Sequence, residues 1–478
     1  MERTKKLGKN LLIITIGSFL SKILSFLFLP LYTSALTTSE YGIADLITTS
    51  VNLLVPFATL VIGEAIMRFS LGKEEEFKKI FSSGVRTCLI STILTVCVAL
   101  IIANFTVLKD YRIILSISLL VSCTYNILSF FSRGIGAVKN YSISGVINTF
   151  CIVTLNIIFL VVVKAGLIGY ILSTIIAEII SIIYLLSCKN VRSNLSVRKK
   201  HYEKKLAKSM LKYSIPLVPN SISWWISNSS DKYILTIFHG LANNGVYSVS
   251  YKVPSILSLI INIFSSAWII SAVDDFGSEE SRKFYSDVYN KYISISLIGI
   301  SLLIFLNKLL ATVLFSSKFY GAWMYQPVLI IGVAFHGLAG FLGSIYTSSK
   351  NTKMILISTV IGAILNIILN LSLIPKHGAM GAAIATTISY VVVWLIRAIN
   401  SRKIMKLTVN YSRILISFII IIVQLCFEYN TKSIVSMKSF VALIIVVLLN
   451  FKTILSTILI LANAFIKRKK VKCDKKST

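Results

Sequence analysis

The sequence predicts an all-α integral membrane protein with about fourteen transmembrane helices, and three observations lead to this prediction. Of the 478 residues, 55% are apolar and only 14% are charged, with a mean hydropathy of +0.81; soluble globular proteins do not have such a composition. The apolar stretches extend to roughly 20 residues, the length that a helix needs to cross a bilayer. Most of the net charge of +31 lies between alternate stretches.

Each apolar stretch is expected to form one membrane-spanning helix, because stretches of this length with few charges are typical of such helices. In chain order the predicted spans lie near residues 10–32, 41–67, 80–103, 112–136, 141–163, 167–188, 213–238, 245–272, 287–306, 322–346, 354–374, 380–398, 411–428 and 439–462.

The basic residues between the spans predict the orientation of the chain, because Lys and Arg accumulate in cytoplasmic loops. Both termini are then cytoplasmic, and the chain is a multi-pass protein of the cell membrane. We attribute the basic blocks to topology and to anionic lipid rather than to nucleic acid, since no aromatic-interleaved basic face accompanies them. The cytoplasmic blocks include Arg3 to Lys9, Lys73 to Lys79, Lys189 to Lys212, Arg402 to Arg413 and Lys467 to Lys476.

The longest interruption between spans follows the sixth predicted helix. There, apolar and aromatic residues recur among lysines at three- and four-residue spacing, which is typical of an amphipathic helix at a membrane surface; they are Tyr202, Leu206, Met210 and Tyr213. Such a helix could tether two six-helix lobes. The predicted parts are an N-terminal lobe of residues 1–188, a cytoplasmic amphipathic linker of 189–212, a C-terminal lobe of 213–400, two additional transmembrane helices in 401–466 and a basic cytoplasmic tail of 467–478.

Two similar turn segments favour a repeat. Thr38 to Asp45 follows the first span and Ala242 to Val249 follows the seventh, and in each a polar cluster leads into a glycine and a β-branched residue. The two glycines, Gly42 and Gly245, are 203 residues apart and lie on the same predicted outside face. Lobes of equal orientation would be related by a pseudo-two-fold axis along the membrane normal, with a substrate cavity between them.

Charges inside the predicted spans are the candidate site residues, because an ionisable side chain near the bilayer centre costs about 2.5 to 3.5 kcal/mol without a partner or a wet cavity. Lys22 lies midway along the first span, and Lys252 lies about two turns into the eighth. These lysines belong to the opening helices of the two predicted lobes. They predict a cationic cavity that suits an anionic headgroup.

Five further charges complete this set. Glu64 and Arg68 are four residues apart on one face of the second span, so they could form a structural ion pair or take part in transport. Glu178 is central in the sixth span. Asp231 and Lys232 are adjacent in the seventh span, so their side chains point to different sides of the helix. Each of these two residues therefore needs a separate partner.

The sequence contains no pattern that predicts catalysis. Its seven cysteines are scattered without Cys-x-x-Cys spacing, which predicts neither a disulfide framework nor a metal site. No Walker A pattern or nucleophile elbow is present. We therefore expect that the chain is not an enzyme and has no metal or organic cofactor.

Four stretches of the sequence resemble a known family, the Wzx-like polysaccharide repeat-unit flippases of the multidrug/oligosaccharidyl-lipid/polysaccharide (MOP) exporter superfamily. The resemblance covers most of the chain. In chain order the stretches read PLYTSALTTSEYGIADL (30–46), GEAIMRF (63–69), YSIPLVPNSISWWISNSSDKYIL (213–235) and NGVYSVSYKVPSIL (244–257).

The resemblance implies a substrate and a mechanism. The substrate would be an oligosaccharide on undecaprenyl pyrophosphate, which is moved from the inner to the outer leaflet by alternating access for surface polysaccharide biosynthesis. By matching position, Arg68, Asp231, Lys232 and Lys252 look like the polar positions of the family. A polysaccharide polymerase and glycosyltransferases would be partners.

A proton or sodium gradient often drives members of this superfamily, and Glu64, Glu178 and Asp231 would be the coupling carboxylates. Two relatives remain alternatives, a lipid II flippase and a MATE-type drug exporter, although the cationic residues disfavour a cavity for cationic drugs. A membrane polysaccharide polymerase is a further alternative. It would need a larger outside loop than this chain offers.

Overall fold

The computed structural model describes residues 24, 26–71, 76–273, 279–349, 353–451 and 453, without the side chains of 263, 266, 267 and 269–273. In this part of the chain every regular element is a helix, and nine helices are long and apolar enough to cross a membrane. The predicted all-α membrane fold is therefore confirmed. The first predicted span, with Lys22, and the basic tail 467–478 lie largely or wholly outside the described residues.

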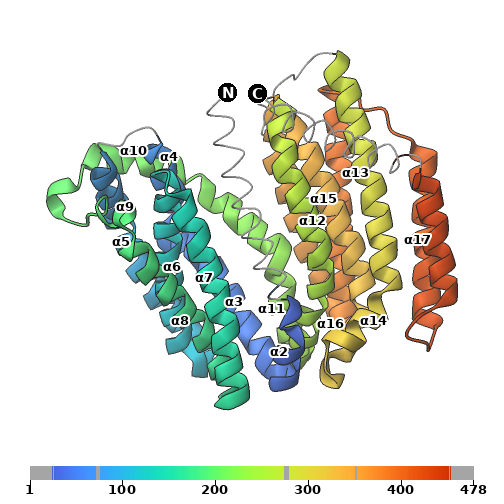
Figure 1. Ribbon diagram of the computed structural model, residues 1–478, viewed down its shortest axis with the longest axis horizontal. Coiled ribbons are helices and arrows are strands. Elements are labelled where there is room, and N and C mark those ends of the chain that lie inside the picture. Colours follow the sequence, from blue (N-terminus) through green and yellow to red (C-terminus); the bar gives the residue numbers. More distant parts are fainter. Residues whose placement is uncertain are drawn as a thin grey trace, which may run out of the picture. The chain divides into compact units, whose positions relative to one another are not determined.

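The chain forms two compact units, shown in blue to green and in yellow to red in Figure 1. The first unit comprises residues 1–248 with two short later segments, Leu314–Phe319 and Ile374–Gly378. The remaining residues form the second unit. The predicted boundaries of the lobes, the linker and the tail stay predictions.

The first unit contains ten α-helices of the described residues, the last of which extends two residues into the second unit. They are α2 (Leu29–Ala35), α3 (Thr38–Thr59), α4 (Ile62–Ser70), α5 (Phe77–Ala103), α6 (Arg112–Gly134), α7 (Val138–Asn156), α8 (Gly166–Ser187), α9 (Lys189–Arg192), α10 (Lys204–Ser214) and α11 (Leu217–Ser250).

Helix α3 begins at a capping box. The backbone N–H of Glu40 donates to the Thr37 side chain, and the backbone N–H of Thr37 donates to the Glu40 carboxylate at 2.8 Å; together they satisfy two donors that a helix start leaves open. The helix ends at Leu60 and Val61, which both have left-handed backbone angles (φ 51° and 54°). This conformation is uncommon for β-branched or bulky residues. The second predicted span is therefore divided into α3 and α4.

The predicted amphipathic segment forms α10, and its apolar side packs on the first unit. Met210 is fully buried in a cluster with Ile66 of α4 and Ile80 of α5. The contact is close, since a Cβ atom added to Gly84 would lie 3.2 Å from Met210 Cε. Tyr202 precedes the helix. Residues after the sixth predicted span are thus held against the helices before it.

Helices α3 and α11 cross at the two glycines that the turn segments share. A Cβ atom on Gly42 would lie 2.2 Å from the carbonyl oxygen of Leu241, and one on Gly245 would lie 1.9 Å from the carbonyl oxygen of Thr38. The contact is reciprocal, because each glycine lies against the carbonyl group of the residue four positions before the other glycine. Two helices can approach this closely only where the residues at the contact are small. The Asn244 amide also donates to the Gly42 carbonyl at 3.1 Å.

The second unit contains seven helices of the described residues. They are α12 (Lys252–Val273), α13 (Glu279–Phe305), α14 (Asn307–Leu314, whose last residue belongs to the first unit), α15 (Gln326–Ser348), α16 (Lys353–Asn400), α17 (Tyr411–Asn430) and the helix Met437–Phe451. Element α16 joins two helices across Gly378 (φ 54°), in agreement with predicted spans 354–374 and 380–398.

A buried arginine connects helices within the second unit. The Arg397 guanidinium donates to the hydroxyls of Ser358 and Thr359 at 2.9 and 3.0 Å and to the carbonyl oxygen of Ala339 at 2.9 Å. These acceptors lie on both α15 and the first half of α16. A guanidinium with several acceptors can be buried at a helix interface because its fixed donors are satisfied.

We predict that Gly245→Ala lowers the stability of the protein. The added methyl group would meet backbone atoms of α3, so the helices must separate, at a cost of roughly 1 to 3 kcal/mol. Gly145→Ala is the matched control, because no atom lies within 4 Å of a Cβ at this helical glycine and alanine favours a helix over glycine. The melting temperature of the detergent-purified chain measures both. If Gly245→Ala melts no lower than Gly145→Ala, the glycine contact is not a constraint on the fold.

Candidate functional site

The crossing of α3 and α11 brings charged side chains together inside the first unit. The Lys232 ammonium group lies 2.9 Å from Asp45 Oδ1, and the two side chains are 14% and 19% exposed. On the same helix as Lys232, the carboxylate of Asp231 accepts a hydrogen bond from the Tyr247 hydroxyl at 2.7 Å. We call Asp45, Asp231, Lys232 and Tyr247 the α3–α11 charge cluster.

The backbone explains why these groups meet. Asp45 follows Gly42 by one turn, and Lys232 precedes the kink at Gly240 by about two turns. From the helix end at Thr38, Asp45 is roughly 10 Å along the axis at 1.5 Å per residue. Of the two helices, α3 is long and apolar enough to cross a membrane and α11 is not among the helices that meet this criterion. The charge cluster therefore lies about two turns along α3, below the helix end that we predict to face outside.

The ion pair is partly accessible and incompletely satisfied. Among the described residues, Asp45 Oδ2 is buried and has no hydrogen-bond partner, although the other oxygen of the carboxylate holds Lys232. A carboxylate can accept about four hydrogen bonds. The Asp45 carboxylate thus has an unused acceptor on its buried oxygen, while the pair as a whole is partly exposed.

Hydroxyl and aromatic groups continue the polar surface toward the other end of α3. The hydroxyls of Ser50 and Tyr233 are hydrogen-bonded to one another. The indole N–H of Trp225 donates to the Thr49 carbonyl at 2.8 Å, and the Trp225 and Tyr233 rings are 5.6 Å apart. Together with the charge cluster, these side chains provide positive, negative and neutral polar groups along one helix pair.

The sequence prediction for Asp231 and Lys232 agrees with this geometry, because the two adjacent side chains have different partners. Asp45 was missed as a site residue, although it ends the first turn segment. The sequence did contain a signal for Asp45, because it is an acidic residue inside a predicted span. It also lies one turn after Gly42, the glycine of the first turn segment. The roles of Asp231 and Lys232 in substrate binding and ion coupling stay predictions.

Lys252 lies directly after a break in the eighth predicted span, and its role in substrate binding stays a prediction. The eighth predicted span is interrupted at Tyr251, and Lys252 is the first residue of α12 rather than a residue about two turns inside a helix. Pro254 lies in the first turn of α12. Proline is favoured at a helix start and disfavoured in a helix interior, so the sequence carried a signal for this break. Lys252 belongs to the second unit, and Lys22 lies outside the described residues.

Glu64 and Arg68 lie on α4 but do not form the ion pair that their spacing allows. Within the described part of the chain, the ion pairs are Lys232 with Asp45, Arg282 with Glu279 and Lys291 with Asp287. Arg68 is exposed in the last turn of α4, and Glu64 is half-buried in its first turn, directly after the left-handed residues. Neither side chain thus has an ion-pair partner among the described residues.

Glu178 is half-buried in the middle of α8, and its carboxylate accepts a hydrogen bond from the Ser122 hydroxyl of α6 at 2.8 Å. Among the described residues no cation pairs with it. An intramembrane carboxylate held by a neutral hydroxyl can be neutralised by taking up a proton, which removes the cost of the charge.

No metal centre is built by the described residues, where no group of three or more His, Cys, Asp or Glu side chains could hold an ion.

We predict that the Lys232–Asp45 pair is energetically coupled. Lys232→Met or Asp45→Asn alone breaks a partly buried ion pair and should cost about 2 kcal/mol of stability, whereas the double variant should recover part of that loss. Unfolding of the purified variants in a double-mutant cycle measures the coupling. Lys291→Met, which removes a pair with 60%-exposed Asp287, should change stability by about 0.5 kcal/mol or less. Additive single effects at Lys232 and Asp45 would contradict the prediction.

The family model described as "Polysaccharide biosynthesis protein" matches residues 7–270. A probable low-salt glycan biosynthesis flippase of Haloferax volcanii is 24% identical over 258 residues. That alignment covers 53% of this chain and 54% of the relative, so the chain spans about half the length of the curated protein it matches.

Two solved structures have a similar fold. The lipid II flippase MurJ in an inward closed conformation has a TM-score of 0.67 and 17% identity, with 94% of this chain and 100% of that chain covered. An inward-facing multidrug resistance MATE family transporter of the MOP superfamily has a TM-score of 0.64 and 12% identity, with 83% and 95% covered. These likenesses confirm the predicted fold class, an all-α membrane protein.

Proposed function

Because the chain belongs to the polysaccharide biosynthesis protein family, we propose that it is a flippase that moves a lipid-linked oligosaccharide from the inner to the outer leaflet of the cell membrane. The substrate is an oligosaccharide repeat unit on undecaprenyl pyrophosphate, destined for surface polysaccharide. The work of the protein is to carry a polar headgroup past hydrocarbon, and no covalent step is required.

The observation that carries this proposal is the partly exposed pair between Lys232 of α11 and Asp45 of α3, a helix long and apolar enough to cross a membrane. A pyrophosphate can take the place of Asp45 as the partner of Lys232, since charge-assisted hydrogen bonds to phosphate offset the loss of solvation. Binding of the pyrophosphate would break the Lys232–Asp45 pair, and this cost limits the affinity for the substrate. A limited affinity suits a carrier, because the substrate must be released on the other side. The hydroxyls of Ser50 and Tyr233 provide the kind of polar partners that sugar hydroxyls need.

We further propose that an ion gradient drives the cycle, with Glu178, Glu64 and Asp231 as the candidate carboxylates and H⁺ or Na⁺ as the ion. Support comes from Glu178, which is held by the single hydroxyl of Ser122 in the middle of α8. Protonation of this carboxylate would remove a charge from the membrane interior. The energy of a transport step could then be coupled to the movement of one proton.

Removal of the protein should leave intact lipid-linked repeat units on the inner leaflet, and leaflet-specific labelling of membranes measures their location. Lys232→Ala should reproduce part of this defect at normal protein level. If binding of the pyrophosphate weakens by roughly 1.4 kcal/mol, the transport rate at low substrate falls about tenfold. Lys291→Ala is the matched control and should transport normally.

Two outcomes of that labelling would point elsewhere. Unpolymerised units on the outer leaflet in the absence of the protein would indicate a polymerase or an assembly protein. A changed distribution of lipid II with unaffected repeat units would indicate the lipid II flippase alternative.

Glu178→Gln should make transport in proteoliposomes insensitive to an imposed pH gradient, because an amide cannot exchange a proton. Ser122→Ala is the control, since it removes the hydrogen bond and keeps the carboxylate, and it should retain the response. Transport by the unmodified chain that ignores both pH and sodium gradients would rule out ion coupling altogether.

A further inference from the structure

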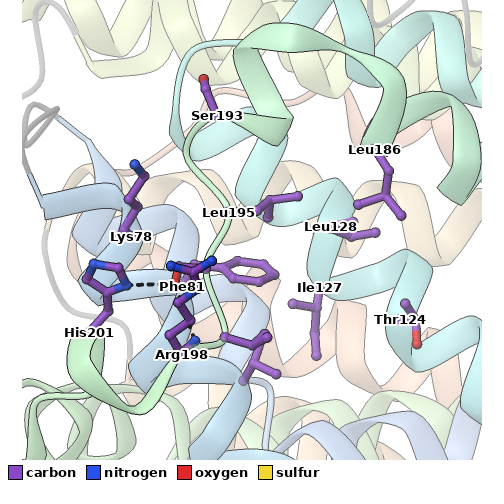
Figure 2. A pocket seen from close by; sticks show the side chains of 13 residues that line it. Lys78, Phe81, Thr124, Ile127, Leu128, Leu186, Ser193, Leu195, Arg198 and His201 are labelled. Carbon is purple, nitrogen blue, oxygen red and sulfur yellow. Dashed lines mark hydrogen bonds between the residues drawn. The ribbon is translucent and has the colours of Figure 1, made fainter.

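A pocket of about 690 Å³ lies in the first unit, away from the charge cluster. Its thirteen lining residues come from α5, α6, the end of α8 and the segment between α9 and α10 (Figure 2). By the charge rule applied to the sequence, this segment of residues 193–203 is cytoplasmic. The pocket therefore opens at the predicted inner leaflet.

One side of the pocket is apolar. Phe81, Ile127 and Leu128 form part of the buried core of the unit, and Leu195 packs against that core from the segment above. Figure 2 shows Thr124, Ile127 and Leu128 following one another along α6. One turn beyond Thr124, Leu120 is 44% exposed, so the apolar side continues into the lipid-facing surface of the helix.

The other side is basic. Lys78, Arg198 and His201 line it, and none of the thirteen lining residues is acidic. The pKa of His201 is lowered by desolvation and by the positive charges of Lys200 and Lys78, and then of Arg198 and Lys79. A positive potential of this kind, next to an apolar wall, favours a ligand that has an anionic group at the end of a hydrocarbon chain.

Hydrogen bonds to α5 fix the basic segment in place. The Ser82 hydroxyl donates to the Arg198 carbonyl at 3.0 Å, and Arg86 Nε donates to the Val197 carbonyl at 2.9 Å. The Ser196 hydroxyl lies 2.6 Å from His201 Nδ1. The backbone of the segment and the His201 ring are thus held in place by the fold, while the Lys78 and Arg198 side chains are exposed. The fixed backbone and the adjoining apolar wall distinguish the pocket from a run of lysines on a mobile segment, which attracts lipid without a defined geometry.

We propose that this pocket binds one anionic phospholipid of the cytoplasmic leaflet. Its phosphate contacts Lys78 and Arg198, and the first part of an acyl chain lies against Ile127 and Leu128. A free phosphate ion would leave the apolar wall uncovered, and a zwitterionic lipid would bring a second positive charge to the basic side. The lipid would be a resident ligand, so the inference goes beyond the proposed transport function.

The test is lipid retention by the full chain purified in detergent, measured by native mass spectrometry with phosphatidylglycerol or phosphatidylcholine. The chain should retain phosphatidylglycerol in preference to phosphatidylcholine. K78Q/R198Q should weaken phosphatidylglycerol binding about 30-fold, because each basic residue near a lipid surface contributes about 1 kcal/mol. K205Q/K208Q removes the same charge from exposed positions of α10 that do not line the pocket, and should leave binding unchanged.

A second variant tests the apolar side without changing charge. Thr124→Trp should fill the end of the pocket on α6 and also weaken phosphatidylglycerol binding. Equal losses in K78Q/R198Q and K205Q/K208Q would show general surface attraction and overturn the proposal. Displacement of the lipid by inorganic phosphate would show a simple anion site and overturn the proposal. If undecaprenyl phosphate displaces the lipid at a far lower concentration than phosphatidylglycerol does, the pocket belongs to the transported lipid instead. Because retention is measured without transport, failure here leaves the proposed function standing.

Discussion

The reciprocal contact of Gly42 and Gly245 is the constraint on which the organisation of the first unit depends. Backbone carbonyl groups of Thr38 and Leu241 occupy the space where side chains of these residues would begin. Helices that approach so closely gain dispersion contacts. In lipid these contacts drive helix association, since the hydrophobic effect is absent between helices there. The contact joins α3 to a helix more than 150 residues later in the chain, and so it determines which side chains of both helices can meet.

The charge cluster is one consequence of that crossing. Asp45 and Lys232 would each be expensive in a membrane by itself, whereas at 2.9 Å each compensates the other. The pair is neither fully buried nor fully exposed. This intermediate position suits a binding site, because a deeply buried pair could not exchange partners and a fully solvated pair would contribute little.

The pocket at the predicted cytoplasmic end also places charged side chains next to apolar ones, but without an ion pair. There the basic residues are offset by no acidic residue of the lining, and hydrogen bonds from α5 hold the segment that carries Arg198 and His201. Helix α10 continues the segment and packs Met210 on the core. The stretch of chain between the sixth and seventh predicted spans therefore has two roles. Its apolar residues pack on the core of the unit, and its basic residues lie at the predicted membrane surface.

The sequence by itself determined the membrane class, the all-helical fold, the approximate spans and the amphipathic α10, because these depend on local hydropathy and on charge counted along the chain. It also identified Gly42 and Gly245 as equivalent, yet it could not show that they touch. Only the tertiary structure decided that Asp45 is the partner of Lys232 and that Glu64 and Arg68 are not paired. Such pairings depend on distances between residues far apart in sequence and on local breaks at ordinary residues such as Leu60 and Val61, and hydropathy records neither.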